Sequence, residues 1–367
     1  AASSTAATTD AAPPAQPWSM WGFDPQHTRY NAEATFRPPF RTLWSAGFGD
    51  LVEFPPSADD RGVFVETNKG LLVSLDLTTG KRRWTTRIAS GADVLASSPA
   101  LDARFAYVTS LDGHVVAVNR GSGRIRWKVA VGSRTESSPI LVDGILYCGT
   151  EGGLLLAIDA ASGHVRWRAQ AGGALKASPA YDKGRLYIGS YDGQVYAFDA
   201  ATGRRLWATG SLGRFGGLQA GRFYSTPAIA YGRIYLGSQD SRVYSLVEAT
   251  GQIAWTRSTG DWIYSGPAIA YGMVFIGSYD DHLYAMDART GDLRWSFDAG
   301  GNISGAPTVV NGVVYFSAFG PGSFGLEART GRLVWRDADG RYTPVIATRD
   351  AFYFAGTGSL SRLAPRR

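Results

Sequence analysis

Tryptophan recurs along this chain at an almost constant interval, and this periodicity limits the folds that the chain can adopt. The gaps are 40, 43, 40, 40, 48, 40 and 40 residues between Trp44, Trp84, Trp127, Trp167, Trp207, Trp255, Trp295 and Trp335. A repeat of about 40 residues is typical of propeller blades when each repeat contains short strands. The spacing therefore predicts a ring of similar β-sheets.

The clearest repeat divides into four short runs of alternating apolar and polar residues. We expect strands at 178–181, 185–190 and 194–199 and a fourth strand around Trp207. Asp-Gly and Thr-Gly pairs separate the runs, and such pairs are typical of hairpin turns. Each repeat therefore predicts one four-stranded antiparallel blade.

The first and last repeats are incomplete, and together they make one blade. The strand predicted at 41–47 follows no earlier strands, whereas residues 342–367 lack a tryptophan strand of their own. If residues 41–47 join the last sheet, no unpaired strand edge is left at the seam of the ring. The sequence predicts an all-β, eight-bladed propeller over residues 41–367, closed by its N-terminal strand.

A motif inside the repeats resembles the tryptophan-docking motif of the pyrroloquinoline quinone (PQQ) type propellers, which are quinoprotein dehydrogenase-like or BamB-like. Its Ala, Gly and Trp recur at offsets 0, 6 and 10, as in Ala197, Gly203 and Trp207. The resemblance begins near Trp18 and covers roughly residues 18–367. It implies an eight-bladed fold in which each indole packs across the interface to a neighbouring blade.

The resemblance leaves two classes of function open. Some members of the family are quinoprotein dehydrogenases, and others are BamB-type scaffolds of outer-membrane assembly or sensor domains of bacterial membrane kinases. The alcohol dehydrogenases carry an adjacent cysteine pair beside PQQ, whereas this chain has one cysteine, Cys148. We therefore favour a non-catalytic protein that holds a protein, peptide or cell-envelope ligand and needs no cofactor. The alternative is a sugar or alcohol dehydrogenase that binds PQQ with calcium at the channel mouth.

Charge and hydropathy exclude some partners. The chain has 37 Lys and Arg against 31 Asp and Glu, a net charge of +6, but no basic run. Nucleic-acid binding needs clustered positive charge, so we do not expect it. No stretch of about 18 apolar residues exists, so we expect no membrane span in this chain.

The N-terminal residues predict how the protein is placed. Residues 1–17 are rich in Ala, Ser, Thr and Pro and predict a flexible linker, and residues 18–40 predict a leader that packs on the propeller. The chain does not begin with Met, so we expect a signal peptide or membrane anchor upstream. We expect an extracytoplasmic bacterial monomer, either free or as the sensor domain of an anchored protein.

The residue types that carry catalysis are scarce. None of the four histidines, His27, His114, His164 and His282, forms a pair with metal-ligand spacing. Cys148 lies in an apolar strand and is expected to be a buried structural thiol. We therefore predict neither a metal site nor catalytic residues.

Ligand binding is expected at positions where the repeats differ. Three residues before the proline that opens each blade, the repeats read Glu53, Ala96, Glu136, Lys176, Tyr224, Tyr264, Ser304 and Arg341. The first strand of a propeller blade is innermost, so these side chains should surround one mouth of the channel, a favourable place for a ligand. The candidates are Glu53, Glu136, Lys176, Tyr224, Tyr264 and Arg341. In the alternative interpretation, ion pairs and tyrosines simply fill the channel.

Two stretches on the same face depart from the repeat. Residues 210–223 are about eight residues longer than the equivalent connections, and residues 319–324 form a second irregular stretch. Glycine-rich loops with basic and aromatic residues suit a partner contact, although a tolerated surface insertion explains them equally well. The candidate contacts are Arg214, Phe215, Arg222, Phe223 and Trp262.

Overall fold

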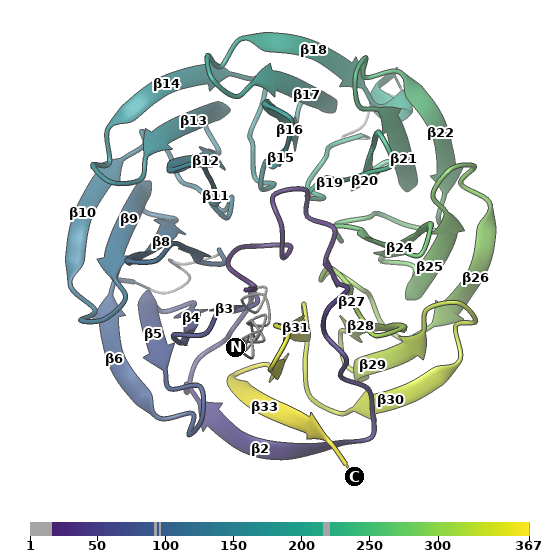
Figure 1. Ribbon diagram of the computed structural model, residues 1–367. Helices are drawn as coiled ribbons and strands as arrows, with labels where there is room; N and C mark the ends of the chain where they lie inside the picture. Colours follow the sequence, from purple (N-terminus) through teal and green to yellow (C-terminus); the bar gives the residue numbers. More distant parts are fainter. Residues whose placement is uncertain (1–16, 92–93, 95–96, 216–220, 367) are drawn as a thin grey trace, which may run out of the picture.

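Eight antiparallel sheets form a closed ring in the computed structural model, as Figure 1 shows. The structure describes residues 17–91, 94, 97–215 and 221–366. In each blade the strands follow in order from the channel to the outer edge. The all-β, eight-bladed propeller predicted from the repeats is confirmed.

The blades follow the order of the chain, and only the last one combines both ends. Blades 1 to 4 consist of β3 (Ser57–Ala58), β4 (Val63–Thr67), β5 (Leu71–Leu75), β6 (Arg82–Arg87); β7 (Ala100–Leu101), β8 (Phe105–Ser110), β9 (His114–Asn119), β10 (Ile125–Ala130); β11 (Ile140–Val142), β12 (Ile145–Gly149), β13 (Leu154–Asp159), β14 (Val165–Gln170); and β15 (Ala180–Asp182), β16 (Arg185–Gly189), β17 (Gln194–Asp199), β18 (Arg205–Gly210). Blades 5 to 8 consist of β19 (Ala228–Ala230), β20 (Arg233–Ser238), β21 (Arg242–Val247), β22 (Ile253–Ser258); β23 (Ala268–Ala270), β24 (Met273–Gly277), β25 (His282–Asp287), β26 (Leu293–Asp298); β27 (Thr308–Val310), β28 (Val313–Ala318), β29 (Gly322–Glu327), β30 (Leu333–Asp337); and β31 (Val345–Ala347), β32 (Phe352–Ala355), β33 (Ser359–Pro365), β2 (Phe40–Gly47).

The ring is closed by pairing between the two ends of the propeller. β2 pairs antiparallel with β33, and its register joins Phe40 to Pro365 and Gly47 to Ser359. The N-terminal strand therefore forms the outer edge of the last blade, as the sequence predicts. This arrangement leaves no unpaired sheet edge inside the ring.

The first strand of blade 4 begins later than the sequence predicts. In blade 4 the prediction starts at Ser178, whereas β15 starts at Ala180. Pro179 has no N–H group for a sheet, and the N–H of Ser178 donates to the hydroxyl of Thr226 in the next blade at 3.3 Å. The segment before the strand therefore bonds between blades rather than within one.

The recurring tryptophans join neighbouring blades. In six cases the indole N–H donates to a main-chain carbonyl of the next blade at 2.7 to 3.1 Å, as in Trp167 to Ala200. The glycine of the motif lies under the indole of the preceding blade. A Cβ at Gly203, whose φ is +73°, would lie 2.7 Å from the Trp167 ring. The motif therefore needs glycine both for its left-handed backbone and for the close approach of the ring.

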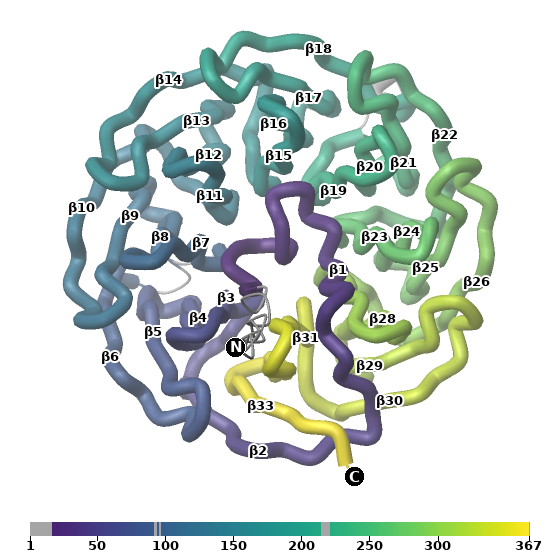
Figure 2. The backbone as a smooth tube through the Cα atoms, viewed as in Figure 1, coloured from purple at the N-terminus to yellow at the C-terminus, as the bar shows by residue number. Residues whose placement is uncertain are grey.

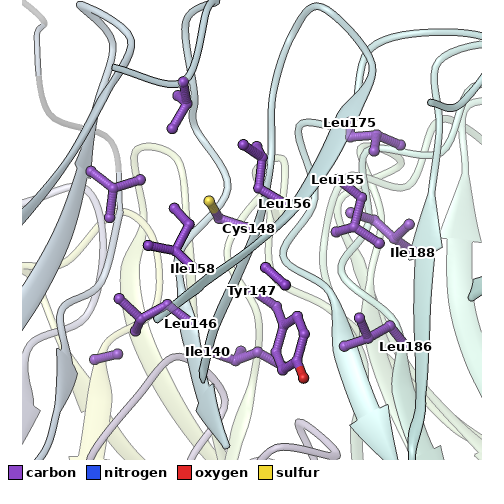
Figure 3. Close-up of a cluster of buried hydrophobic side chains, with 14 of the residues drawn as sticks. Ile140, Leu146, Tyr147, Cys148, Leu155, Leu156, Ile158, Leu175, Leu186 and Ile188 are labelled. Carbon is purple, nitrogen blue, oxygen red and sulfur yellow. The ribbon is translucent and has the colours of Figure 1, made fainter. Parts of the chain in front are cut away.

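Apolar side chains fill the space between blades. Figure 3 shows the core of blades 3 and 4, where Leu146, Cys148 and Leu155 lie with Leu186 and Ile188. All five are fully buried. Because each blade buries its faces only against its neighbours, the ring is stable as a whole rather than blade by blade.

The leader before the first blade crosses the channel, as Figure 2 shows. It makes main-chain hydrogen bonds with the first strand of six blades, at Ala58, Leu101, Tyr181, Ile229, Ile269 and Val309. Its short strand β1 (Tyr30–Asn31) pairs parallel with β27. The Tyr30 ring also contacts Tyr271, which follows the first strand of blade 6. The leader therefore closes the end of the channel opposite the mouth.

Candidate functional site

A small cavity lies at the mouth of the channel, where the eight first strands begin. Its volume is about 70 Å³, enough for a few water molecules. Of the predicted mouth positions, the cavity is lined by Glu53, Glu136, Lys176, Tyr224, Tyr264 and Ser304. Trp21 of the leader also lines it, together with Phe54 and Tyr342. The structure therefore brings five of the six predicted ligand-binding residues to one cavity.

Arg341, the sixth candidate, lies beside the cavity rather than in its wall. Its guanidinium carbon is 5.0 Å from the Phe319 ring centre and 5.8 Å from that of Tyr342. Ala96, the remaining mouth position, lies outside the described residues. The residue types differ between the two sides of the mouth. Acidic residues lie on one side, and aromatic residues with arginines lie on the other.

An ionic cluster forms the polar side of the mouth. The Lys176 ammonium lies 2.9 Å from Glu136 and 3.3 Å from Glu151. Burial lowers the pKa of Lys176, but the hydrogen bonds and negative charges of Glu136 and Glu151 together outweigh burial, so the pKa is raised overall. The Tyr224 hydroxyl donates to Glu136 at 3.2 Å. Burial, with the charge of Glu136, raises the pKa of Tyr224 well above its ordinary value. Lys176 therefore stays charged and Tyr224 stays neutral at physiological pH.

A continuous row of aromatic rings, which we call the aromatic arc, forms the other side. It consists of Tyr191, Tyr224, Tyr264, Tyr279, Phe319 and Tyr342, and successive ring centres are 4.8 to 6.4 Å apart. Trp262 contacts Tyr264 and is 46% exposed. The Arg222 guanidinium carbon lies 5.5 Å from the Tyr191 ring centre. The arc thus has an arginine near each end and an exposed indole beside its middle.

Sequence reasoning missed three rings of the arc: Tyr191, Tyr279 and Tyr342. Tyr191, Tyr279 and Phe319 lie in the turn between the second and third strands of blades 4, 6 and 7, at the same distance after the mouth position of each repeat. Main-chain bonds hold these turns beside the connection that enters the blade, such as Tyr279 N–H to the Trp262 carbonyl at 2.9 Å. An aromatic residue at this turn position in three repeats was the available signal.

Residues 210–223 and 319–324, the two stretches predicted to depart from the repeat, have different structures. Arg214 and Phe215 end a 3-10 helix at Leu212–Phe215, and residues 216–220 lie outside the described residues. The prediction for residues 319–324 is wrong: the turn between β28 and β29 covers only residues 319–321, as many as residues 239–241 in blade 5. Its Gly-Pro-Gly sequence departs from the other repeats, but its length does not.

Phe223 is also not a surface contact, which corrects the prediction. Its side chain is 1% exposed and lies 5.4 Å from the Tyr244 ring, in a T-shaped contact inside the blade core. It sits against Gly189, which has no side chain to displace it. Phe223 therefore packs in the core at the end of the 210–223 connection, whereas Arg222 lies at the mouth.

The leader places a buried cation below the mouth. Arg29 is 1% exposed, and its guanidinium donates to the carbonyls of Pro267 at 2.8 Å and His27 at 3.1 Å. It also lies 4.9 Å from the Trp21 ring centre. Burial lowers the pKa of Arg29 to about 9, so the group is still charged at neutral pH. These contacts hold Trp21, the leader residue that lines the cavity, in place.

The described residues do not form a metal site. Among them, no group of three or more His, Cys, Asp or Glu side chains could hold an ion. Cys148 is buried, and burial raises the pKa of its thiol to about 12. His27 is buried in the leader, and burial lowers its pKa well below the ordinary value. Both side chains are therefore part of the protein interior.

Comparison with known families identifies the repeats. The family described as outer membrane protein assembly factor BamB matches residues 36–137, 89–176, 111–262 and 239–360. These matches together cover most of the chain. No curated protein sequence matches it. Within the described residues, no helix is long and apolar enough to cross a membrane.

Solved structures of several kinds share the fold. BamB from Moraxella catarrhalis is 17% identical with a TM-score of 0.72, over 89% of this chain and 100% of that one. A europium-containing methanol dehydrogenase is 13% identical with a TM-score of 0.81, over 95% and 98%. The computationally designed protein Ika8 is 15% identical with a TM-score of 0.75, over 88% and 99%. An assembly factor, an enzyme and a designed protein share this architecture, so the likeness shows the fold alone.

Proposed function

Because this chain belongs to the family described as outer membrane protein assembly factor BamB, we propose that it is a non-catalytic binding protein. Its ligand is a segment of a partner protein, held on the mouth face by the aromatic arc and by Arg222, Arg341 and Trp262. The single observation that carries this proposal is the arc itself, a row of touching rings on one face with an exposed indole beside it.

The composition of the arc supports a protein ligand. Tyr, Trp and Arg are the residue types that contribute most to the free energy of protein interfaces. The rings are also held before a partner arrives, because Tyr224 is bonded to Glu136 and the rings pack on one another. A surface that is already ordered loses little conformational entropy on binding. The mouth face is therefore better suited to binding than an equally aromatic but mobile loop.

The alternative, a PQQ-dependent dehydrogenase, has less support from the residues at the mouth. A cofactor pocket is usually about 300–1,000 Å³, whereas the mouth cavity is about 70 Å³ and has Trp21 in its wall. PQQ carries carboxylates, which Glu53 and Glu136 in the cavity wall would repel. Lys176 also lines the cavity, but its charge is already paired with Glu136 and Glu151. The residues present do not fit PQQ with calcium, so we propose that the protein works without this cofactor.

We also propose that the protein works outside the cytoplasm. The description of its family refers to outer-membrane assembly, and this is the support for an extracytoplasmic place. The same binding face would serve a scaffold or the sensor domain of an anchored protein. In both cases the mouth face is the surface that meets the partner.

Photocrosslinking from the mouth face tests the binding function. A photoreactive phenylalanine replaces Trp262, and a control protein carries it at Tyr231, which is 63% exposed and follows the first strand of blade 5 on the opposite face. We expect one discrete protein adduct from position 262 in the cells that make the protein, lost when Tyr264→Ala is added. Adducts from position 231 alone, or adducts unaffected by Tyr264→Ala, would contradict the proposal.

Titration with PQQ and calcium tests the alternative. Absorbance and thermal unfolding of the purified protein are followed as PQQ is added with Ca²⁺, and we expect neither saturable binding nor a shift in melting temperature. Saturable binding together with dye-linked oxidation of glucose or an alcohol would show that the protein is a dehydrogenase instead.

A further inference from the structure

The outer strands of the first four blades contain basic residues and no acidic residues. The outer strands β6, β10, β14 and β18 contain eight cations and no Asp or Glu, namely Arg82, Arg83, Arg87, Arg126, Lys128, Arg166, Arg168 and Arg205. In the sequence these residues form small groups, one group in each repeat, that are separated by about 40 residues. The ring of blades gathers them on one side of the rim (Figure 1).

These cations are largely free of acidic partners. Two of them are paired: Lys128 lies 3.3 Å from Asp112, and Arg166 lies 2.6 Å from Asp159. Among the described residues the other six form no ion pair, and Arg82, Arg83 and Arg87 donate to main-chain carbonyls. On the other side of the ring the outer strands β22, β26 and β30 contain only three cations, Arg257, Arg294 and Arg336, and the first two are paired with acidic residues. Arg294 lies 2.6 Å from Asp287 in blade 6, and Arg332 lies 2.6 Å from Glu327 in blade 7. The charge on the rim is therefore concentrated over blades 1 to 4.

Protection of the strand edge does not account for this bias. Charged side chains on an edge strand prevent pairing with other chains, but either sign of charge serves that purpose. The outer strands of blades 6 and 7 use both signs, since they end in Asp298 and Asp337. A single sign over four neighbouring blades favours a partner that is negatively charged over a wide area.

The shape and one apolar side chain indicate what kind of partner this is. The outer wall of the ring is convex, so a flat surface meets the outer strands of two neighbouring blades at a time. β6 and β10 together have five cations, the largest number among neighbouring pairs. Ile125 lies between Arg124 and Arg126 and is 44% exposed. An apolar side chain among cations suits the interface of a lipid bilayer, where it can contact acyl chains. The phosphate backbone of a nucleic acid has no apolar surface for such a side chain to contact.

We propose that β6 and β10 dock the protein on the surface of an anionic lipid bilayer. The cations face the headgroups, and Ile125 enters the boundary between headgroups and acyl chains. The propeller then stands on its rim, with the mouth face perpendicular to the membrane and open to a partner. This surface is separate from the mouth, so the proposal stands or falls independently of the proposed function.

Vesicle co-sedimentation tests the proposal directly. Vesicles of phosphatidylcholine with about 30 mol% phosphatidylglycerol should bind the protein at low salt, binding should fall as NaCl is added, and phosphatidylcholine alone should not bind. The variant Arg82→Gln/Arg87→Gln/Arg126→Gln should lose about 100-fold in partition constant, because each cation near the surface contributes several-fold. All three side chains are exposed, and glutamine keeps a donor for the carbonyls.

Two matched controls separate the surface from net charge. The variant Arg289→Gln/Arg329→Gln/Arg336→Gln makes the same charge change at exposed positions on blades 6 and 7, and it should bind within about twofold of the unchanged protein. Ile125→Ser should weaken binding, whereas Leu333→Ser, at an equivalent position that is 43% exposed, should not.

Three results would overturn the proposal. The first is the absence of binding to anionic vesicles, and the second is an equal loss in the two triple variants. The third is binding to duplex DNA that is stronger than binding to vesicles and is unchanged by Ile125→Ser, which would assign the surface to nucleic acid instead.

Discussion

Glu66 places a carboxyl group inside the first blade, and among the described residues no cation forms an ion pair with it. Its side chain is 5% exposed and accepts hydrogen bonds from the Ser97 hydroxyl at 3.0 and 3.1 Å. Burial raises the pKa of Glu66 well above its ordinary value. The carboxyl group is therefore protonated in the folded protein over a range of pH where it is ionised in the unfolded chain.

This raised pKa makes a prediction about stability and pH. The contribution of Glu66 to stability is complete below its unfolded pKa and is lost as the pH rises through the folded pKa. Glu66→Gln has no such dependence, so we expect its melting temperature to equal that of the unchanged protein near pH 4 and to exceed it increasingly toward pH 8. Melting curves across this range check the prediction. A variant that is less stable at pH 8 than at pH 4, relative to the unchanged protein, would contradict it.

Trp167 tests the docking role of the tryptophan series at the same scale. Its indole packs on Gly203 and donates to the Ala200 carbonyl at 3.1 Å. Trp167 is partly buried and packed against the core, and we expect Trp167→Ala to lower the free energy of unfolding by about 3–5 kcal/mol, as large-to-small changes at packed sites do. Trp262→Ala is the control: Trp262 is outside the docking frame and exposed, so it should change stability by less than about 0.5 kcal/mol. Equal effects of the two substitutions in denaturant unfolding would be evidence against the docking role.

At the scale of elements, the pairing of β2 with β33 closes the ring and makes a crosslink prediction. Ser45 and Ser361 are register partners, and their hydroxyl oxygens are 3.0 Å apart. The variant Ser45→Cys/Ser361→Cys should form a disulfide on oxidation and gain about 2–4 kcal/mol of stability, because the bond constrains the unfolded chain. The reduced variant and Ser45→Cys alone are the controls, measured by thermal unfolding.

The closure would be refuted if no crosslink formed in the folded protein. Cys148 does not compete for the disulfide, because it is buried in blade 3. An oxidised variant with an unchanged melting temperature would show that the seam opens only after the rest of the ring unfolds.

Elements were predictable from the sequence to different degrees. Strands such as Gln194–Asp199 were predicted to the residue, because turn pairs mark both of their ends. The start of β15 was placed too early, because Ser178 bonds to another blade and no local pattern shows this. Phe223 was assigned to the surface for a related reason, since a loop residue gives no local sign of entering the core. Local patterns thus predict most of each strand. Contacts between blades determine where β15 begins and why Phe223 is buried, and local patterns do not show these contacts.

The candidate site was predicted in part for the same reason. Glu136 and Lys176 share one frame position in successive repeats, so their approach to one mouth follows from the repeat. The aromatic arc combines this position with the turn after the second strand, which is about 15 residues away in the chain. The ring contact of Tyr264 with Tyr279, at 4.8 Å, exists only once the turn bends over the mouth. In the sequence, Tyr264 and Tyr279 occupy different positions of the repeat, and no local pattern relates them.

At the scale of the whole molecule, the propeller separates three surfaces. The leader closes one end of the channel, the aromatic arc faces out of the other, and basic strands form one side of the rim. The basic residues behind the net charge of +6 are spread along the whole sequence, because each repeat has its cations near its tryptophan. Folding turns this regular spacing into a concentrated patch.

The measurement that tests the binding function most directly is the affinity of the crosslinked partner segment. A synthetic peptide of that segment is titrated calorimetrically into the unchanged protein, Trp262→Ala, Tyr264→Ala and, as a control on the opposite face, Tyr231→Ala. We predict at least about a tenfold loss of affinity for each mouth variant, as for aromatic residues at the centre of an interface, and no change for Tyr231→Ala. Unchanged affinity in both mouth variants, or a loss confined to Tyr231→Ala, would contradict the account.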